Sequence, residues 1–405
     1  MSGPYRIGIV GFGVAGGALA CLLARAGHAV TLLERAPRVG PIGAGLLLKP
    51  SGQQVLHRLG LLEPIVARSE RLERIHAFMA NGRTLINMPY GEIAPGCCAY
   101  GVHRGTLFDT LHAAVRVEKV PISLDCAITG WREKDEQVYA LDTEAKEHGP
   151  YDFLVATDGS NSALRHAMFP RLPASDYTFG ALWTVGRCTQ VRGYLHQIVE
   201  GTRHLLGLLP IGGERCTFFW GLQRDELETV RQKGFPAWRD SVLRLSPLAE
   251  EVLADVSDFD GFLFTGYRHI RLRYPYNERI VCVGDAAHSM SPHLGQGASL
   301  ALLDAECLTQ ALEATPDFHA AFRLYRQNRL AHIRYYALLS GLLTPFFQSN
   351  AGILGLGRDL ALPILTHLPF VRRQMLLTMG GVKKGLLGGS LELIAQPEPV
   401  PPIVA

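Results

Sequence analysis

Three glycines near the start of the chain have the spacing of a dinucleotide-binding turn. Gly11, Gly13 and Gly16 form a G-x-G-x-x-G motif between an apolar strand, Tyr5–Val10, and a helix. Gly11 permits the tight turn, Gly13 lets the backbone approach a pyrophosphate, and Gly16 lets the helix pack closely on the strand. Glu34 ends the next strand, where its carboxylate can bind a ribose diol and would repel a 2′-phosphate. The pattern indicates a site for FAD or NAD rather than NADP.

Two later motifs place acids and glycines at the ends of apolar segments. Asp158-Gly159 follows Phe153–Ala156, and Gly284-Asp285 follows Arg279–Val283. The second motif continues as Pro-His-Leu-Gly-Gln-Gly over Pro292–Gly297. Open α/β sheets bind ligands beyond the carboxyl ends of their strands. We therefore expect both motifs at the ligand-binding edge of the sheet.

The elements that must position these motifs can be read from the apolar pattern. Tyr5–Val10, Val14–Ala26 and His28–Leu33 predict the strand, helix and strand of a βαβ unit. Between Tyr177 and Arg273, short apolar runs separated by glycines and charges predict an antiparallel sheet. Further helices are predicted at Gln53–Ala67, Leu107–Val117 and Trp238–Val256, and strands around Phe78–Tyr90. Arg279–Val283 again has the pattern of a buried strand, like Tyr5–Val10. A glycine-rich loop and a helix that ends near Leu312 are predicted to follow it.

The three motifs, in this order, resemble those of the flavoprotein aromatic hydroxylases, whose prototype is para-hydroxybenzoate hydroxylase. The resemblance covers some 290 residues. It implies an α/β fold in which a Rossmann-type, glutathione reductase-like FAD-binding domain carries an inserted antiparallel substrate domain and C-terminal helices. The implied segments are FAD-binding parts 1–72, 101–175 and 274–330, substrate-domain parts 73–100 and 176–273, and a C-terminal helical region 331–405.

The resemblance also implies an activity. NADH or NADPH would reduce FAD, O2 would add to form a C4a-hydroperoxyflavin, and one oxygen atom would pass to an aromatic substrate. Since there is one dinucleotide fingerprint, the nicotinamide would bind transiently as a co-substrate. Whether it is NADH or NADPH stays open, because Glu34 concerns the FAD adenosine.

Residue by residue, the resemblance assigns contacts to FAD. Asp285 would bind the ribityl chain, and Arg104 the phosphates and ribityl chain. Asp158 would help to hold the cofactor and the nicotinamide-binding face. A helix starting near Gly297 would direct its positive end at the flavin N1–C2=O edge. The full set of expected FAD contacts is Gly11, Gly13, Ala15, Gly16, Glu34, Arg35, Arg104, Asp158, Gly284, Asp285, Pro292, Gly295, Gln296, Gly297 and Ala298.

Residues for catalysis and substrate binding are less sharply indicated. The backbone at Pro292 and the side chain of His293 lie beside the expected oxygen pocket, so both are catalytic candidates. His288, inside the G-D motif, is interpreted as structural. Trp183 and Trp220 lie on predicted strands and are candidates to stack on a planar substrate, with core packing as the alternative.

Three positions depart from the family pattern near the flavin or substrate. Thr157 precedes Asp158-Gly159 where relatives often have alanine, and Ser299 stands where many have asparagine. A Lys49-Pro50-Ser51 turn replaces the usual Pro-Asn turn. None of these changes removes a motif.

Composition excludes some other classes. The chain has 405 residues, of which 47% are hydrophobic and 19% charged, and its formal net charge is +3 without a concentrated basic face. This argues against nucleic acid as a partner. The eight cysteines form no C-x-x-C pair, so no metal site is expected. We expect them to be reduced, as in a cytoplasmic enzyme. No targeting segment is expected, because cleavage within Tyr5–Val10 would destroy the first predicted strand.

The C-terminal third bears on the substrate. The uncharged run 335–357 is interrupted by Pro345, Gln348 and Asn350, so it does not predict a membrane span. It is interpreted as a helical cap. Alternatively, the basic residues Arg372, Arg373, Lys383 and Lys384 among leucines and methionines are compatible with peripheral membrane contact. The tail is also similar to that of ubiquinone-biosynthesis hydroxylases, which implies a lipophilic phenol, quinone-precursor or polyketide-like substrate. Gln396–Ala405 is expected to be an irregular tail.

Other functions remain as alternatives. The principal one is an FAD-dependent epoxidase or reductase of an alkene or prenyl substrate. A flavin-dependent halogenase is disfavoured because the four tryptophans form no W-x-W-x-I-P segment. A non-catalytic carrier is disfavoured because all three motifs are intact. The sequence leaves open whether the protein is a monomer or a homodimer.

Overall fold

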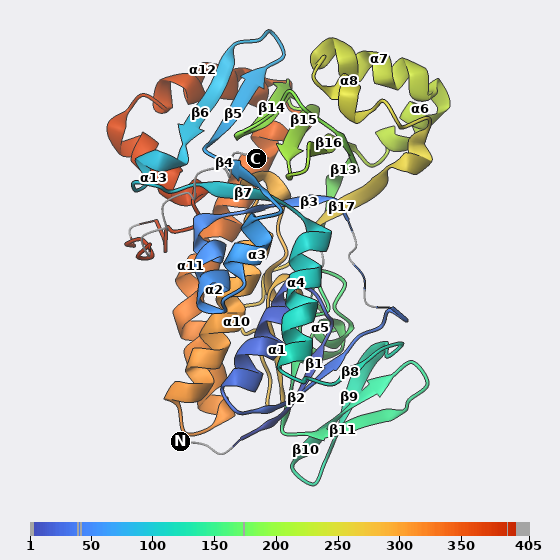
Figure 1. Cartoon of the computed structure of the whole chain (residues 1–405), viewed down its shortest axis with the longest axis vertical. Coiled ribbons are helices and arrows are strands. Elements are labelled where there is room, and N and C mark those ends of the chain that lie inside the picture. The colour runs from blue at the N-terminus through green and yellow to red at the C-terminus, as the bar shows by residue number, and fades with distance from the viewer. Residues whose placement is uncertain (1–3, 39, 41–42, 173–174, 387, 394–405) are drawn as a thin grey trace, which may run out of the picture.

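The computed structural model describes residues 4–38, 40, 43–172, 175–386 and 388–393. Its lower half in Figure 1 is a five-stranded parallel sheet in the order β18-β12-β1-β2-β8. The predicted βαβ unit is present, since β1 pairs in parallel with both β2 and β12. The strands of this sheet are β1 Arg6–Val10, β2 Ala29–Leu33, β8 Ile122–Ser123, β12 Phe153–Ala156 and β18 Ile280–Cys282.

Helices cover this sheet and bury their apolar side chains against it and against one another. α1 (Val14–Arg25) packs against α4 (Arg104–Val117) and α10 (Gly297–Ala314). The core beneath them contains fully buried Ile7, Leu19 and Leu302. The remaining small elements are β3 Gly45–Leu48, α2 Pro50–Arg58, α3 Leu62–Val66, β4 Glu70–Leu72, η1 Tyr90–Glu92, β7 Ala99–His103, β9 Ile128–Lys134, β10 Gln137–Asp142, β11 Glu147–Tyr151, α5 Ala163–Met168, α9 Asp285–His288 and η3 Pro292–Leu294.

The upper half is a seven-stranded sheet in the order β17-β13-β16-β15-β14-β5-β6. It was expected to be antiparallel and is so except at one point, where β14 and β5 pair in parallel. The exception arises because the β5–β6 hairpin comes from a much earlier part of the chain and joins at the edge. The strands are β5 Arg74–Met79, β6 Thr84–Pro89, β13 Ser175–Arg187, β14 Tyr194–Glu200, β15 His204–Pro210, β16 Arg215–Gln223 and β17 Leu263–His269.

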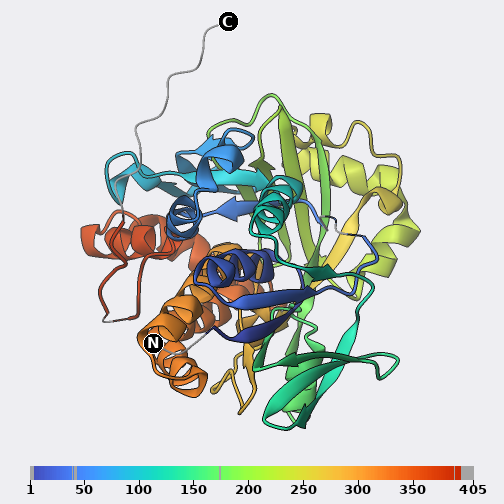
Figure 2. The ribbon, with the colours of Figure 1, turned by 60° about the horizontal axis from the view of Figure 1, so that its bottom comes forward.

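Two predicted helices are each broken in the structure. The segment Gln53–Ala67 is divided into α2 and α3 at Gly60, which has a φ of +71°. The segment Trp238–Val256 is divided where Ser246, in an extended conformation, ends one helix. Here the chain forms α6 Glu226–Lys233, α7 Phe235–Leu245, α8 Ala249–Val252 and η2 Phe259–Gly261. These helices pack on the outer face of the large sheet (Figure 2).

The C-terminal region is helical, as predicted. It consists of α11 Phe318–Phe347, α12 Gly352–Leu365 and α13 Pro369–Met379. α11 runs along α10 from the parallel sheet to the large sheet, and α12 lies against β6 (Figure 1). Among the described residues, no helix combines the length and apolarity that crossing a membrane requires. Membrane contact of this region stays a prediction, and the expected tail Gln396–Ala405 lies outside the described residues.

A buried carboxylate ties the G-D motif to the long helices. Asp304 on α10 accepts hydrogen bonds from the Gly284 N–H (3.0 Å) and the Arg329 Nε–H (2.6 Å), and it also pairs with His288. Burial works to raise the pKa of Asp304, but His288 and Arg329 outweigh it and hold that pKa well below its usual range. His288 therefore serves the structure, as expected.

We predict that Asp304→Ala lowers the free energy of unfolding by about 3–5 kcal/mol, because Arg329 would be left buried without its counter-ion. The matched control on the same helix is Glu306→Ala. It breaks a partly exposed pair with Arg58 and should cost about 1 kcal/mol or less. Equal losses for the two variants in denaturant titrations would contradict the assigned role of Asp304.

Candidate active site

The glycines of the first motif have different structural roles. Gly11 has a φ of +101°, and a Cβ atom there would lie 2.8 Å from the Asp158 Cα. A Cβ atom at Gly16 would lie 2.1 Å from the Gly11 carbonyl oxygen. At Gly13, in contrast, no atom lies within 4 Å of the Cβ position. Gly11 and Gly16 are therefore required by the chain itself, whereas Gly13 leaves backbone accessible to a ligand.

The start of α1 is suited to a pyrophosphate. Its first turn has no side-chain cap, so its N–H groups are available to an anion. Glu34 lies beside this turn because its carboxylate accepts hydrogen bonds from Phe12 N (2.6 Å) and Ala36 N (2.9 Å). Arg35 is exposed next to it, and Ala15 is buried within α1.

The G-D motif lies directly against this turn. A Cβ atom at Gly284 would be 3.4 Å from the Ala15 Cβ, and the motif's acid, Asp285, begins α9. Asp285 Oδ1 is 3.9 Å from the Cβ position of Gly297, the first residue of α10, and α10 also lacks a side-chain cap. Arg104, at the start of α4, interacts electrostatically with Asp285. The first turn of α1, the start of α9 and the start of α10 therefore lie close together, as expected of motifs at the carboxyl ends of parallel strands.

The D-G motif closes the other side of the turn. Asp158 Oδ2 accepts a hydrogen bond from Ala163 N (2.8 Å). Its Oδ1 is buried and has no hydrogen-bond partner in the described part of the chain. Burial raises the pKa of Asp158, partly offset by hydrogen bonds from Ser162 and from the backbone. An additional hydrogen-bond donor, such as a cofactor hydroxyl, would satisfy this oxygen.

The loop before α10 was expected to contact the flavin through several residues. Pro292 and Gly297 are exposed, and Gly295 adopts the left-handed conformation with a φ of +57°. Ala298 is half-buried in the first turn of α10. Gln296 is buried, and its Nε2 donates to the Thr378 carbonyl (3.0 Å) at the end of α13. The Gln296 side chain thus anchors the loop through its Nε2, while its Oε1 is buried without a hydrogen-bond partner among the described residues.

Residues 5–332 match a family model described as an FAD-binding domain. The chain belongs to this FAD-binding family. The FAD cofactor, the Rossmann-type fold and the resemblance to the flavoprotein aromatic hydroxylases are thereby confirmed, and with them the enzyme class, an FAD-dependent monooxygenase.

The similar proteins are monooxygenases of about the same length. Aurachin C monooxygenase/isomerase of Stigmatella aurantiaca is 26% identical over 80% of this chain and 84% of that protein. The 6-hydroxynicotinate 3-monooxygenase of Bordetella bronchiseptica is 29% identical, over 81% of this chain and 88% of that protein. Among solved structures, Pseudomonas aeruginosa PqsL in complex with 2-aminobenzoylacetate has a TM-score of 0.77 at 22% identity, covering 88% of this chain and 100% of PqsL.

The inner face of the large sheet lies against the FAD-binding domain. The Thr217 side chain of β16 lies against the Cβ position of Gly45 on β3. The Cβ position of Gly221, also on β16, lies against the side-chain amide of Gln348 at the end of α11. Phe219 lies between these two contacts, so it is on the same face, and it packs on Trp183 with ring centroids 5.1 Å apart. Trp183 therefore faces the FAD-binding domain, and its contact with a substrate stays a prediction.

Trp220 has the opposite orientation. It is 4% exposed and packs against Trp238 of α7, in the cluster under α6–α8. The reason is the alternation of side chains along a strand, since neighbours Phe219 and Trp220 must point to opposite faces. Core packing, the alternative interpretation, is correct for Trp220, and its predicted stacking on the substrate is wrong.

His293 connects the loop to this inner face. Its ring lies 6.4 Å from that of Tyr267 on β17 and 5.9 Å from that of Phe347 on α11. Its Nδ1 hydrogen-bonds to Ser291 Oγ (3.0 Å), while Nε2 is buried without a partner among the described residues. Burial lowers the pKa of His293 to about 4. The imidazole is therefore neutral at pH 7 and can hydrogen-bond a substrate hydroxyl, but it is a weak base.

Several residues of this site were not found from the sequence. Tyr267, Phe219 and Gln348 come from separate strands and a helix end, and they meet only in the fold. Lys49 was noted only as a departure from the family pattern. Its side chain passes 3.6 Å from the Cβ position of Gly295, and its Nζ donates to the Met379 carbonyl (2.6 Å). Burial lowers the pKa of Lys49 to about 7.

We predict that Gly13→Ala leaves the fold intact but weakens FAD binding by about tenfold or more, because the added methyl group meets no protein atom and would meet the pyrophosphate. FAD affinity would be measured by fluorescence titration of the apoprotein. Gly341→Ala on α11, which also adds a methyl group in open space, is the control and should leave FAD affinity unchanged. Unchanged affinity in Gly13→Ala would show that Gly13 does not contact the cofactor.

A second prediction concerns Lys49. Between about pH 7 and about pH 10.4 the unfolded chain binds more protons than the folded one, so this residue makes stability rise with pH across that window. Lys49→Met should therefore stabilise the apoprotein at pH 7 by roughly 1–4 kcal/mol, with the gain shrinking toward pH 10. Exposed Lys134→Met is the control. A Lys49→Met variant without a pH-dependent gain in thermal stability would contradict a buried, uncompensated ammonium group.

Proposed function

We propose that the enzyme hydroxylates a lipophilic aromatic compound, with reduced nicotinamide and O2 as co-substrates, between the Pro292–Gly297 loop and the inner face of the large sheet. FAD would be held by Glu34 beside the first turn, by Arg104 and Asp285, and by the backbone at the start of α10. When bound, FAD supplies the electron transfer and the activation of O2. The observation that carries the proposal is an aromatic, uncharged sheet face placed opposite the loop.

The composition of this face supports a lipophilic substrate. Strand alternation places Ala181, Trp183 and Val185 of β13 on it, together with Thr217 and Phe219 of β16. Phe219 lies over Gly207 of β15, where a Cβ atom would come 2.0 Å from the ring. A flat apolar wall of this kind binds a planar ring and excludes water. None of these five side chains is charged, and the two arginines that alternation places on the same face, Arg187 and Arg215, lie at the ends of their strands.

His293 and Tyr267 supply the polar groups of the proposed site. A neutral imidazole with a buried, unpaired Nε2 binds a phenol hydroxyl as acceptor or donor, which orients the ring. Because its pKa is about 4, His293 positions the substrate and does not deprotonate it at neutral pH. The relatives support an aromatic substrate, since their names specify oxygenation of 6-hydroxynicotinate and of 3-amino-4-hydroxybenzoate.

The test is a visible spectrum of the purified enzyme, followed by NADH and NADPH oxidation with a panel of phenols, quinone precursors and prenylated compounds. We predict flavin bands, faster nicotinamide oxidation with a lipophilic phenol, and a product heavier by one oxygen atom. Reduction or epoxidation of an alkene without any reaction of phenols would contradict the proposal and leave the FAD-binding fold standing.

We further predict that Trp183→Ala and Trp220→Ala fail in different ways. Trp183→Ala should retain FAD and raise the substrate KM, lowering kcat/KM by roughly tenfold or more. Trp220→Ala should instead lower the free energy of unfolding by about 3–5 kcal/mol, because it leaves a cavity under α7. If Trp220→Ala raised KM while Trp183→Ala did not, the assignment of the inner face would be wrong.

A further inference from the structure

A second groove lies away from the proposed FAD and substrate residues. It runs between the segment 271–278 and the first half of α11. One end is a pocket of about 300 Å³ lined by Arg271, Arg273, Arg326 and Arg334, with His288 and Arg329 also among its lining residues. None of the residues expected to contact FAD lines this pocket. Its volume is at the lower end of the range for small-molecule sites.

Four of the arginines in this groove have no acidic partner among the described residues. Arg271, Arg273, Arg326 and Arg334 form no ion pair with any acid in the described ranges of the chain, and the pocket has no acidic lining residue. Arg323, Arg326 and Arg334 are spaced so that they fall on one side of α11. Like charges gathered in this way repel one another, and an anion between them would relieve that repulsion. Guanidinium groups are well suited to phosphate oxygens.

The pocket wall is already fixed. Arg329 is held by Asp304, and Arg326 Nε donates to the Arg273 carbonyl (2.8 Å). The Arg326 guanidinium also lies 4.2 Å from the centre of the Tyr274 ring. These contacts hold two of the lining guanidinium groups in place before any ligand binds, which lowers the cost of binding.

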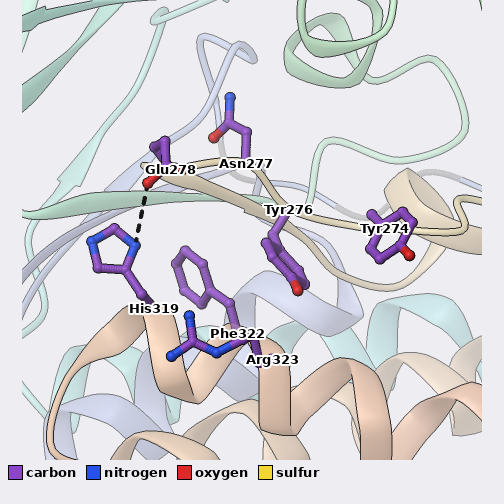
Figure 3. Close-up of a pocket in the computed structure, with 7 residues that line it drawn as sticks. All are labelled: Tyr274, Tyr276, Asn277, Glu278, His319, Phe322 and Arg323. Carbon is purple, nitrogen blue, oxygen red and sulfur yellow. Dashed lines mark ion pairs between the residues drawn. The ribbon is translucent and has the colours of Figure 1, made fainter.

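The groove continues into an adjoining pocket of about 280 Å³ with a different character (Figure 3). Tyr274 joins the two, because it lines this pocket while its ring contacts Arg326 and Arg273 of the first. Tyr276 and Phe322 lie side by side here, with ring centroids 5.9 Å apart. The one acid of this pocket, Glu278, is paired with His319 at 3.8 Å. Aromatic faces of this kind bind flat heterocycles by stacking.

We propose that this groove binds a nucleoside phosphate, with its phosphates among the arginines and its base against Tyr276 and Phe322. The ligand is either the nicotinamide co-substrate, through its adenosine phosphate end, or a separate nucleotide effector. The site is spatially separate from the proposed substrate face, because no residue of that face lines either pocket.

The experiment uses the FAD-saturated holoenzyme and isothermal titration with ADP, inorganic pyrophosphate and adenosine. We expect ADP to bind more tightly than pyrophosphate, adenosine to bind most weakly, and added salt to weaken ADP binding. The double variant Arg271→Gln/Arg334→Gln should lose affinity for ADP by about tenfold or more. Both side chains are exposed and form no hydrogen bond or ion pair within the described residues, so the variant should fold.

The charge-matched control is Arg231→Gln/Arg244→Gln on α6 and α7, which should bind ADP as the parent does. A holoenzyme that binds neither ADP nor pyrophosphate, or an ADP affinity unaffected by Arg271→Gln/Arg334→Gln, would overturn the site. If ADP bound no more tightly than pyrophosphate, the proposed contact of the base with Tyr276 and Phe322 would be wrong. A parallel rise of the KM for NADH or NADPH in the double variant would identify the ligand as the co-substrate. An unchanged KM with weakened ADP binding would identify an effector.

Discussion

The structure depends on one buried carboxylate. Asp304 binds the Gly284 N–H, His288 and Arg329, and so connects the G-D motif to α10 and to α11. A buried charge is costly unless it is paired and hydrogen-bonded, and here three partners satisfy it. Because α9 and the first turn of α10 are fixed in this way, Asp285 and Gly297 stay adjacent, and both are residues expected to contact FAD. The same network fixes Arg329, which lines the arginine groove on the other side of α9.

The sequence was sufficient for features that depend on local backbone geometry. Gly11 was assigned correctly because the turn requires a positive φ (+101°), and Gly16 because a Cβ atom there would meet the Gly11 carbonyl oxygen of the same turn. The βαβ unit follows from the apolar pattern, and the C-terminal helices were expected from the resemblance to the family. The FAD-binding family could therefore be inferred from three motifs alone.

Features that depend on register or on distant segments could not be obtained this way. Trp183 and Trp220 look alike in the sequence, and only their pairing across β13 and β16 shows that one faces the flavin side and the other the α7 cluster. Alternation along Thr217–Gln223 would have separated Phe219 from Trp220, had the strand bounds been known. The parallel β14–β5 pair and the burial of Lys49 under α13 likewise need the whole fold.

Two excesses of positive charge stand out in a chain whose net charge is only +3: the buried Lys49 beside the flavin loop, and the arginines of the groove. The first lies beside the loop that is expected to contact FAD, and the second forms the nucleotide site proposed above. The central claim, oxygen transfer to an aromatic ring, is tested most directly by running the reaction under ¹⁸O2. The account predicts a hydroxylated product that carries one labelled oxygen atom. A product labelled only from water, or hydrogen peroxide with no oxygenated product for any aromatic substrate, would contradict it.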